Sequence, residues 1–128
     1  MSRVIQPKTL SDPRPRYSQG IVTTSGKLLF IAGQTASDAA GKVVGKGNIE
    51  KQAKQVFENL AAVLKAAGGS LNNLVMTTTY ITDIKYREGY NKVRLQYYKK
   101  NPPTSTLVVV KGLANKDYMI EIAGIAVI

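Results

Sequence analysis

Glu121 is the acidic residue of this sequence that stands inside an apolar run, between Ile120 and Ile122. The other seven acidic residues lie on polar helix faces or in turns. Removing a carboxylate from water is costly, so such an acid must find partners or stay protonated. Two interpretations follow from the pattern. Glu121 is either a structural acid satisfied by backbone donors, lysine or arginine, or an acid that binds a ligand or takes part in catalysis.

Few other groups in the chain could do chemistry. Its 128 residues include no Cys and no His, which excludes disulfides, thiol nucleophiles, Ser–His pairs and nearly every zinc site. The hydroxyls of Ser105 and Thr106 therefore have no histidine to activate them. Acid–base chemistry must use Glu121, tyrosine, lysine, backbone groups or water.

The net charge of +10 raises the question of a nucleic-acid partner. The basic residues are scattered, however, and the nearest to clusters are Arg14/Arg16, Lys92/Arg94 and Lys99/Lys100. Scattered charge favours a solvated surface over a nucleic-acid patch. Length and composition predict one globular domain, residues 1–128. No apolar run has transmembrane length and no signal-peptide core is present, so we expect a cytoplasmic protein without a membrane partner.

The hydrophobic pattern predicts two helices among six strands, in the order β-β-β-α-β-α-β-β. Each helix has one apolar stripe, which favours an α+β fold with both helices on one face of a mixed sheet. The other sheet face would expose alternating Val, Ile and Leu, so we expect oligomerisation through it and sites between subunits. The predicted elements are strands Arg3–Gln6, Gly20–Thr24 and Lys27–Ala32 (the latter two a hairpin around Ser25-Gly26), a helix between Asn48 and Gly68, strand Val75–Thr82, helix Tyr86–Lys100, and strands Leu107–Val110 and Met119–Ile128.

Several short motifs occur in a fixed order along the whole chain. They are Tyr17-Ser18-Gln19-Gly20, Gly33-Gln34, Asn91, Pro103-Thr104-Ser105-Thr106-Leu107-Val108, Lys111-Gly112-Leu113 and Ile120-Glu121-Ile122. In this combination the chain resembles the Rid (YjgF-type) family, which includes enamine/imine deaminases. The resemblance implies a chorismate-mutase-like subunit and a homotrimer that binds small metabolites in clefts between subunits.

The resemblance also implies roles for single residues. Glu121 would position the water that attacks a C=N carbon, and Tyr17, Gly33 and Asn91 would belong to the cleft. Hydrolysis of the imine would give a 2-oxo acid and ammonia without a metal or an organic cofactor.

The chain departs from the family pattern at one telling position. An arginine that clamps the substrate carboxylate in active deaminases falls at Ser105, and the serine after it falls at Thr106. Ser105 cannot hold a carboxylate with two charged donors. One hypothesis is a deaminase with an atypical substrate or a substitute cation, for which Arg16 is the first candidate, ahead of Arg14 and Lys111.

The second hypothesis is a trimer that has kept a ligand cleft but not the chemistry. It would be a binding or regulatory protein, or an RNA-binding protein like the relatives described as ribonucleases or translation inhibitors. The dispersed charge and the lack of an RNA-binding motif favour a small-molecule cleft over RNA.

Overall fold

The computed structural model describes residues 2–23, 25–99 and 101–128. It confirms the predicted α+β class and the order of elements. Two short 3₁₀ turns, Leu71–Asn73 and Ile84–Tyr86, lead into the fourth strand and the second helix. The strands are β1 (Ser2–Ile5), β2 (Gly20–Thr23), β3 (Leu28–Thr35), β4 (Leu74–Ile81), β5 (Thr104–Val109) and β6 (Ile120–Val127), and the helices are α1 (Ile49–Ala66) and α2 (Arg87–Tyr97).

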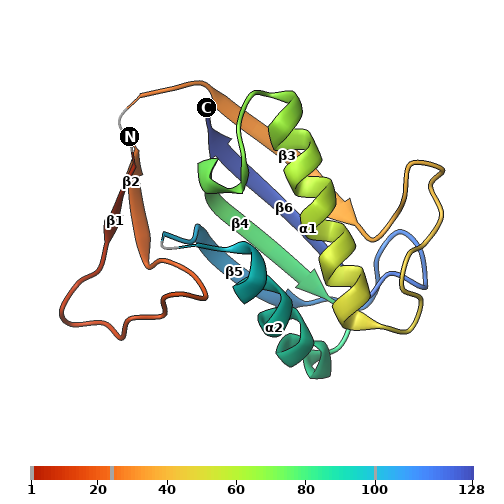
Figure 1. The fold of residues 1–128 in the computed structure, drawn as a ribbon. Coiled ribbons are helices and arrows are strands. Elements are labelled where there is room, and N and C mark those ends of the chain that lie inside the picture. The colour runs from red at the N-terminus through yellow and green to blue at the C-terminus, as the bar shows by residue number, and fades with distance from the viewer. Residues whose placement is uncertain (1, 24, 100) are drawn as a thin grey trace.

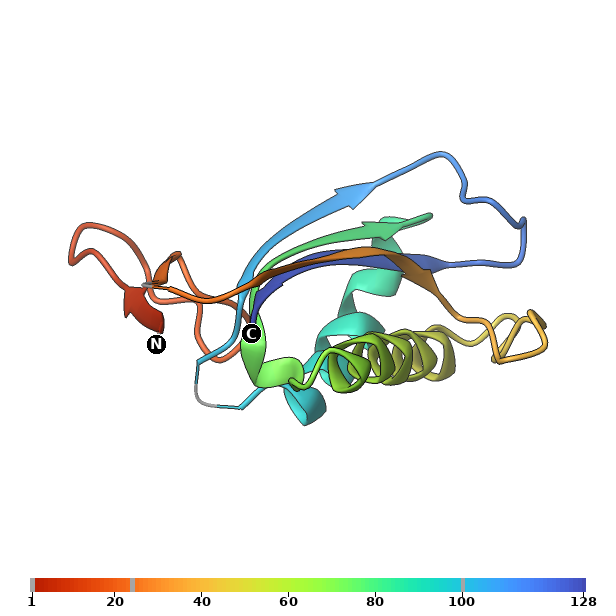
Figure 2. The ribbon, with the colours of Figure 1, turned by 90° about the horizontal axis from the view of Figure 1, so that it is seen from above.

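Four strands form the main sheet, in the order β3-β6-β4-β5. The β4–β5 pair is parallel, and the other two pairs are antiparallel. Both helices cover one face of this sheet and leave the other face open (Figures 1 and 2). The two C-terminal strands are not neighbours, because β4 lies between β5 and β6.

The predicted hairpin between the second and third strands is wrong. β2 pairs with β1, with Arg3 opposite Val22, and the two strands form a separate ribbon that projects from the body (Figure 1). Lys27 exchanges both backbone hydrogen bonds with Ile128, at 2.9 and 2.8 Å. These bonds extend the β3–β6 ladder by one pair, to Lys27, so Lys27 pairs with the C-terminal strand and not with β2. Thr24, the last residue of the predicted strand, lies outside the described residues.

The predicted N-cap, C-terminal glycine and apolar stripe are all found at α1. The side chain of Asn48 accepts a hydrogen bond from the Lys51 N–H, and Gly68 takes a left-handed φ of +86° after the helix. Its apolar stripe is fully buried against the sheet at Ala53, Val56, Phe57, Leu60 and Leu64.

α2 ends three residues earlier than predicted, and Lys100, the last residue of that prediction, lies outside the described residues. Tyr98 is extended, with φ −83° and ψ 135°, and its ring packs edge-on against Phe57 at 5.4 Å between ring centroids. The turn into Pro102 therefore begins at Tyr98, where an aromatic ring enters the core.

The open sheet face is apolar, as expected. Phe30 is 71% exposed, and Leu28, Met76 and Val108 are exposed as well. Phe30, Met76 and Ile125 line a shallow hollow of about 240 Å³ on this face. Among the described residues, no helix combines the length and apolar character needed to cross a membrane.

Candidate functional site

Glu121 points to the open face of the sheet. Its neighbours Ile120 and Ile122 are fully buried under the helices, and side chains alternate along a strand. Register places Glu121 beside Thr35 on β3 and Tyr80 on β4. Glu121 is half-buried, and within residues 2–23, 25–99 and 101–128 neither a hydrogen bond nor an ion pair engages its carboxylate. Within one chain, the described residues therefore supply no donor that would make Glu121 a structural acid.

Gly33 makes room for this carboxylate. The ladder between β3 and β6 shifts register between Ile31 and Gln34, so Gly33 lies in a bulge. A Cβ added at Gly33 would lie 2.7 Å from Glu121 Cδ and would overlap Oε2. Gly33 and Glu121, two predicted site residues, thus adjoin each other on the open face.

Ser105 belongs to the opposite face of the sheet. It is in register with Thr77, which is buried beneath the helices, and its Oγ lies 3.4 Å from Nη1 of Arg94 on α2. Thr106, the next residue along β5, is exposed and alternates to the open face. The two signature positions on β5 therefore face different sides of the sheet.

Arg94 is a functional candidate that the sequence pattern does not single out. The residue is only 4% exposed, and its guanidinium lies 4.7 Å from the ring centroid of Tyr90 and 5.9 Å from that of Tyr17. Nη1 donates to Tyr90 Oη at 3.1 Å, whereas Nε is buried without an acceptor. The signal in the sequence was a basic residue four positions after Tyr90, next to the apolar stripe of α2.

Tyr17 lies near Arg94 because hydrogen bonds hold the segment that contains Tyr17 against the residues just before β5. The backbone N–H of Ser18 donates to Pro103 O at 3.0 Å, and the Ser18 hydroxyl donates to Pro102 O. Both contacts are buried with Ser18, which is 1% exposed. The structure thus brings together Tyr17 and Ser105 around Arg94.

The remaining candidates are placed as follows. Asn91 is half-buried one turn before Arg94, and its Oδ1 is buried without a hydrogen-bond partner. Arg16 and Lys111 are exposed, and Arg14 pairs with Asp12. That pairing lowers the pKa of the Asp12 carboxyl to about 2, chiefly through the side-chain hydrogen bond from Arg14.

Four of the predicted site residues, Glu121, Gly33, Tyr17 and Ser105, therefore fall into two groups. The Glu121 group, with Gly33, is on the open face, and the Arg94 group, with Tyr17 and Ser105, is on the helix side of the sheet. The backbone of the sheet separates the two groups within one chain.

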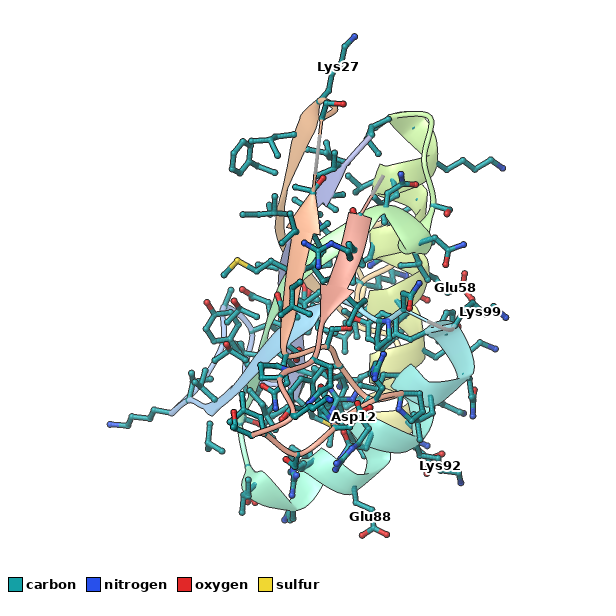
Figure 3. The ribbon with its side chains drawn as sticks, turned by 90° about the vertical axis from the view of Figure 1, so that its left-hand side faces the viewer. Asp12, Lys27, Glu58, Glu88, Lys92 and Lys99 are labelled. Carbon is teal, nitrogen blue, oxygen red and sulfur yellow. The ribbon has the colours of Figure 1, made fainter. Side chains whose placement is uncertain are left out.

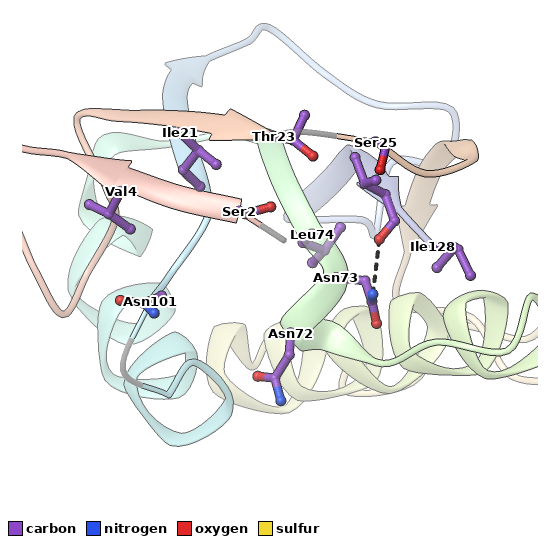
Figure 4. Close-up of a pocket in the computed structure, with 11 residues that line it drawn as sticks. Ser2, Val4, Ile21, Thr23, Ser25, Asn72, Asn73, Leu74, Asn101 and Ile128 are labelled. Atoms are coloured by element: carbon purple, nitrogen blue, oxygen red, sulfur yellow. Dashed lines mark hydrogen bonds between the residues drawn. The ribbon is translucent and has the colours of Figure 1, made fainter.

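Other features offer less chemistry. A cavity of about 350 Å³ lies between the β1–β2 ribbon and the start of β4, where Asn73 donates to Val127 O at 2.9 Å (Figure 4). Among the described residues, the side chains that line this cavity are apolar, hydroxyl or amide groups. In the part of the chain that the structure describes, no three acidic side chains gather as a metal site would require.

Comparisons with known proteins bear on the family and the fold of the chain. The family model described as "Endoribonuclease L-PSP" matches residues 8–128. A "RutC family protein" of Pyrococcus horikoshii is 39% identical over 126 residues, 98% of each chain. The human "2-iminobutanoate/2-iminopropanoate deaminase" is 32% identical over 111 residues, 87% of this chain and 79% of that protein. The crystal structure of YyfB from Yersinia pestis, a Rid-family protein of unknown function, matches with a TM-score of 0.92 at 30% identity, covering 99% of this chain and 98% of that one.

Proposed function

The chain belongs to the Rid (YjgF-type) family, and from that premise we propose that it hydrolyses a small reactive enamine or imine to a carbonyl compound and ammonia. The observation that carries the proposal is the Glu121 carboxylate, which is half-buried beside Gly33 and has no hydrogen-bond or ion-pair partner among the described residues. A carboxylate in this state can accept a proton from a water molecule. The human relative named as an imine deaminase is consistent with this chemistry.

The reaction needs few groups because an iminium carbon is already a good electrophile. Glu121 takes a proton from water as the water oxygen bonds to the C=N carbon, and the C=N electron pair moves to nitrogen. The protonated Glu121 then returns its proton to that nitrogen. As the C–N bond breaks and ammonia leaves, the Glu121 carboxylate takes the remaining hydroxyl proton and the carbonyl forms. Glu121 thus acts first as general base, then as general acid, and finally again as general base.

We place the reaction in clefts between the subunits of a homotrimer. The apolar open face around Phe30 and Met76 supports such an assembly, because a patch of this kind is a usual mark of an interface. The proposal requires that a neighbouring copy present its Arg94 group, which lies at the edge strand β5, to the Glu121 group. The site is then completed between subunits, where the sheet no longer separates the two groups.

The test is turnover of 2-iminopropanoate generated in situ, followed as release of pyruvate above the uncatalysed rate. We expect wild type to accelerate release and Glu121→Gln to lose at least about 100-fold in kcat, the usual scale of a general acid–base contribution. Glu88→Gln is the matched control, because Glu88 is exposed on α2 and should leave the rate unchanged. Equal rates for wild type and Glu121→Gln would rule out this role for Glu121.

RNA binding is a second candidate because the chain carries a net charge of +10. The labelled side chains Lys27, Lys92 and Lys99 project from separate parts of the molecule, and Glu58 and Glu88 lie among them (Figure 3). This dispersion favours the small-molecule cleft. An RNA-binding function would require an affinity that falls steeply as salt is raised from 50 to 200 mM, by roughly 10³-fold for a multi-phosphate contact.

A further inference from the structure

The buried guanidinium of Arg94 lacks an acidic partner. None of the four ion pairs among the described residues involves it, although the residue is only 4% exposed. A buried charge without a counter-ion is unfavourable, because the charge has lost water and gained no opposite charge. Hydroxyl groups and aromatic rings compensate only in part. An anionic ligand would supply the opposite charge that this buried guanidinium lacks.

Among the described residues, the hydrogen bonds of Arg94 leave one edge of the guanidinium without an acceptor. Nη1 is engaged by Tyr90 Oη and Ser105 Oγ, whereas Nε has no acceptor and Nη2 takes part in neither bond. Nε–H and one Nη2–H point in parallel, and this pair of donors matches the two oxygens of a carboxylate. Ser105, at the position of the family's clamp arginine, lies against this guanidinium, with its Oγ 3.4 Å from Nη1.

The rim of the cluster carries a second unsatisfied group. Asn91, one helical turn before Arg94, has a buried Oδ1 without a donor. Tyr17, Asn91 and Ser105 are all half-buried, so the cluster reaches the surface at these residues. An acceptor near an unpaired cation suits a ligand that carries both a carboxylate and an N–H group.

We propose that Arg94 is the carboxylate-binding residue of this protein and takes the place of the clamp arginine that Ser105 replaces. The ligand class is a small 2-imino or 2-oxo acid, an assignment that rests on the proposed function. The positive charge that binds the carboxylate is then supplied by a residue of α2 instead of a residue of β5. Arg16 and Lys111 are exposed, so water already solvates their charges. Arg14 is paired with Asp12. These three residues are therefore weaker candidates for the carboxylate-binding role.

Binding of 2-oxobutanoate, measured by calorimetry with 2-oxobutanamide as the uncharged analogue, tests the proposal. We expect wild type to bind the acid at least tenfold more tightly than the amide. Arg94→Met should lose that preference, Arg94→Lys should keep only part of it, and Arg16→Met should bind like wild type. Melting curves followed by circular dichroism establish that each variant is folded.

A double variant that moves the arginine from α2 to β5 makes the test independent of any loss of stability in Arg94→Met. Ser105→Arg in the Arg94→Met background should restore binding of the acid, because the charge returns from β5. Unchanged acid binding in folded Arg94→Met or Arg94→Lys, or no preference for the acid in wild type, would overturn the proposal. Glu121→Gln separates it from the proposed function: that variant should bind 2-oxobutanoate normally even if wild type hydrolyses no imine.

Discussion

The carboxylate of Glu121 occupies the space that a side chain at Gly33 would need, since a Cβ there would overlap Oε2 and lie 2.7 Å from Cδ. Gly33→Ala should therefore displace the carboxylate. Because the displaced group is the end of a flexible side chain, we expect a loss of less than about 1 kcal/mol in the free energy of unfolding. The imine-hydrolysis rate should fall at least about tenfold, because misplacement of a reacting group by 1 Å can cost 10²-fold.

Gly112→Ala is the matched control, because no atom lies within 4 Å of a Cβ at that position. Urea unfolding and steady-state rates of the two variants separate stability from activity. A fully active Gly33→Ala would show that the position of the Glu121 carboxylate does not matter.

The exposed ring of Phe30 should govern assembly. Phe30→Lys places a charge in the middle of the apolar open face, where desolvation on association would be costly. We expect sedimentation to show a trimer for wild type and monomers for this variant, together with loss of turnover. Leu95→Lys, at an exposed apolar position on α2, should remain trimeric. A trimeric, active Phe30→Lys would place the subunit contact elsewhere.

Tyr98 should make the protein sensitive to alkali. Burial, and then the nearby Tyr90, raise the pKa of its hydroxyl well above the unfolded value of about 10, against smaller opposing effects of Thr77 and Arg94. Within the described residues no hydrogen bond of normal geometry engages this hydroxyl. The stability due to this neutral group is complete below pH 10. It is lost as pH rises further, by up to about 1.4 kcal/mol per pH unit, since only the unfolded chain ionises.

Tyr98→Phe should thus raise the free energy of unfolding by about 1 kcal/mol at pH 7, because an unsatisfied hydroxyl is removed. Its advantage over wild type should widen above pH 10 in urea titrations. Tyr118→Phe, at a half-buried position, serves as the control. A constant difference between pH 7 and pH 11 would contradict this role for Tyr98.

Local sequence signals predicted the start, the end and the buried face of α1. The cap at Asn48, the exit at Gly68 and the buried stripe through Phe57 and Leu60 follow from spacing and residue type alone. The partner of β2 does not, because strand pairing depends on long-range contacts such as those between Lys27 and Ile128. A turn-like Ser25-Gly26 favoured a hairpin that those contacts replace.

In the candidate site, too, local sequence identified one residue, whereas another depends on tertiary packing. Glu121 could be identified because an acid between two isoleucines conflicts with its surroundings. Arg94 could not, since it meets Ser105 only after α2 packs on β5, and Arg16 looked closer to the site because it adjoins Tyr17 in the sequence. The alternation of β5 and β6 also puts Ser105 and Glu121 on opposite faces, a relationship that depends on register.

Mixed trimers test most directly the claim that Arg94 and Glu121 of different subunits complete one site. Glu121→Gln and Arg94→Met chains carrying different tags can be co-expressed and purified through both tags. Each pure variant should be nearly inactive. In a cyclic trimer of mixed composition one of the three clefts has both native residues, so the mixture should recover about a third of the wild-type rate. Mixed trimers as inactive as the two parents would contradict the account.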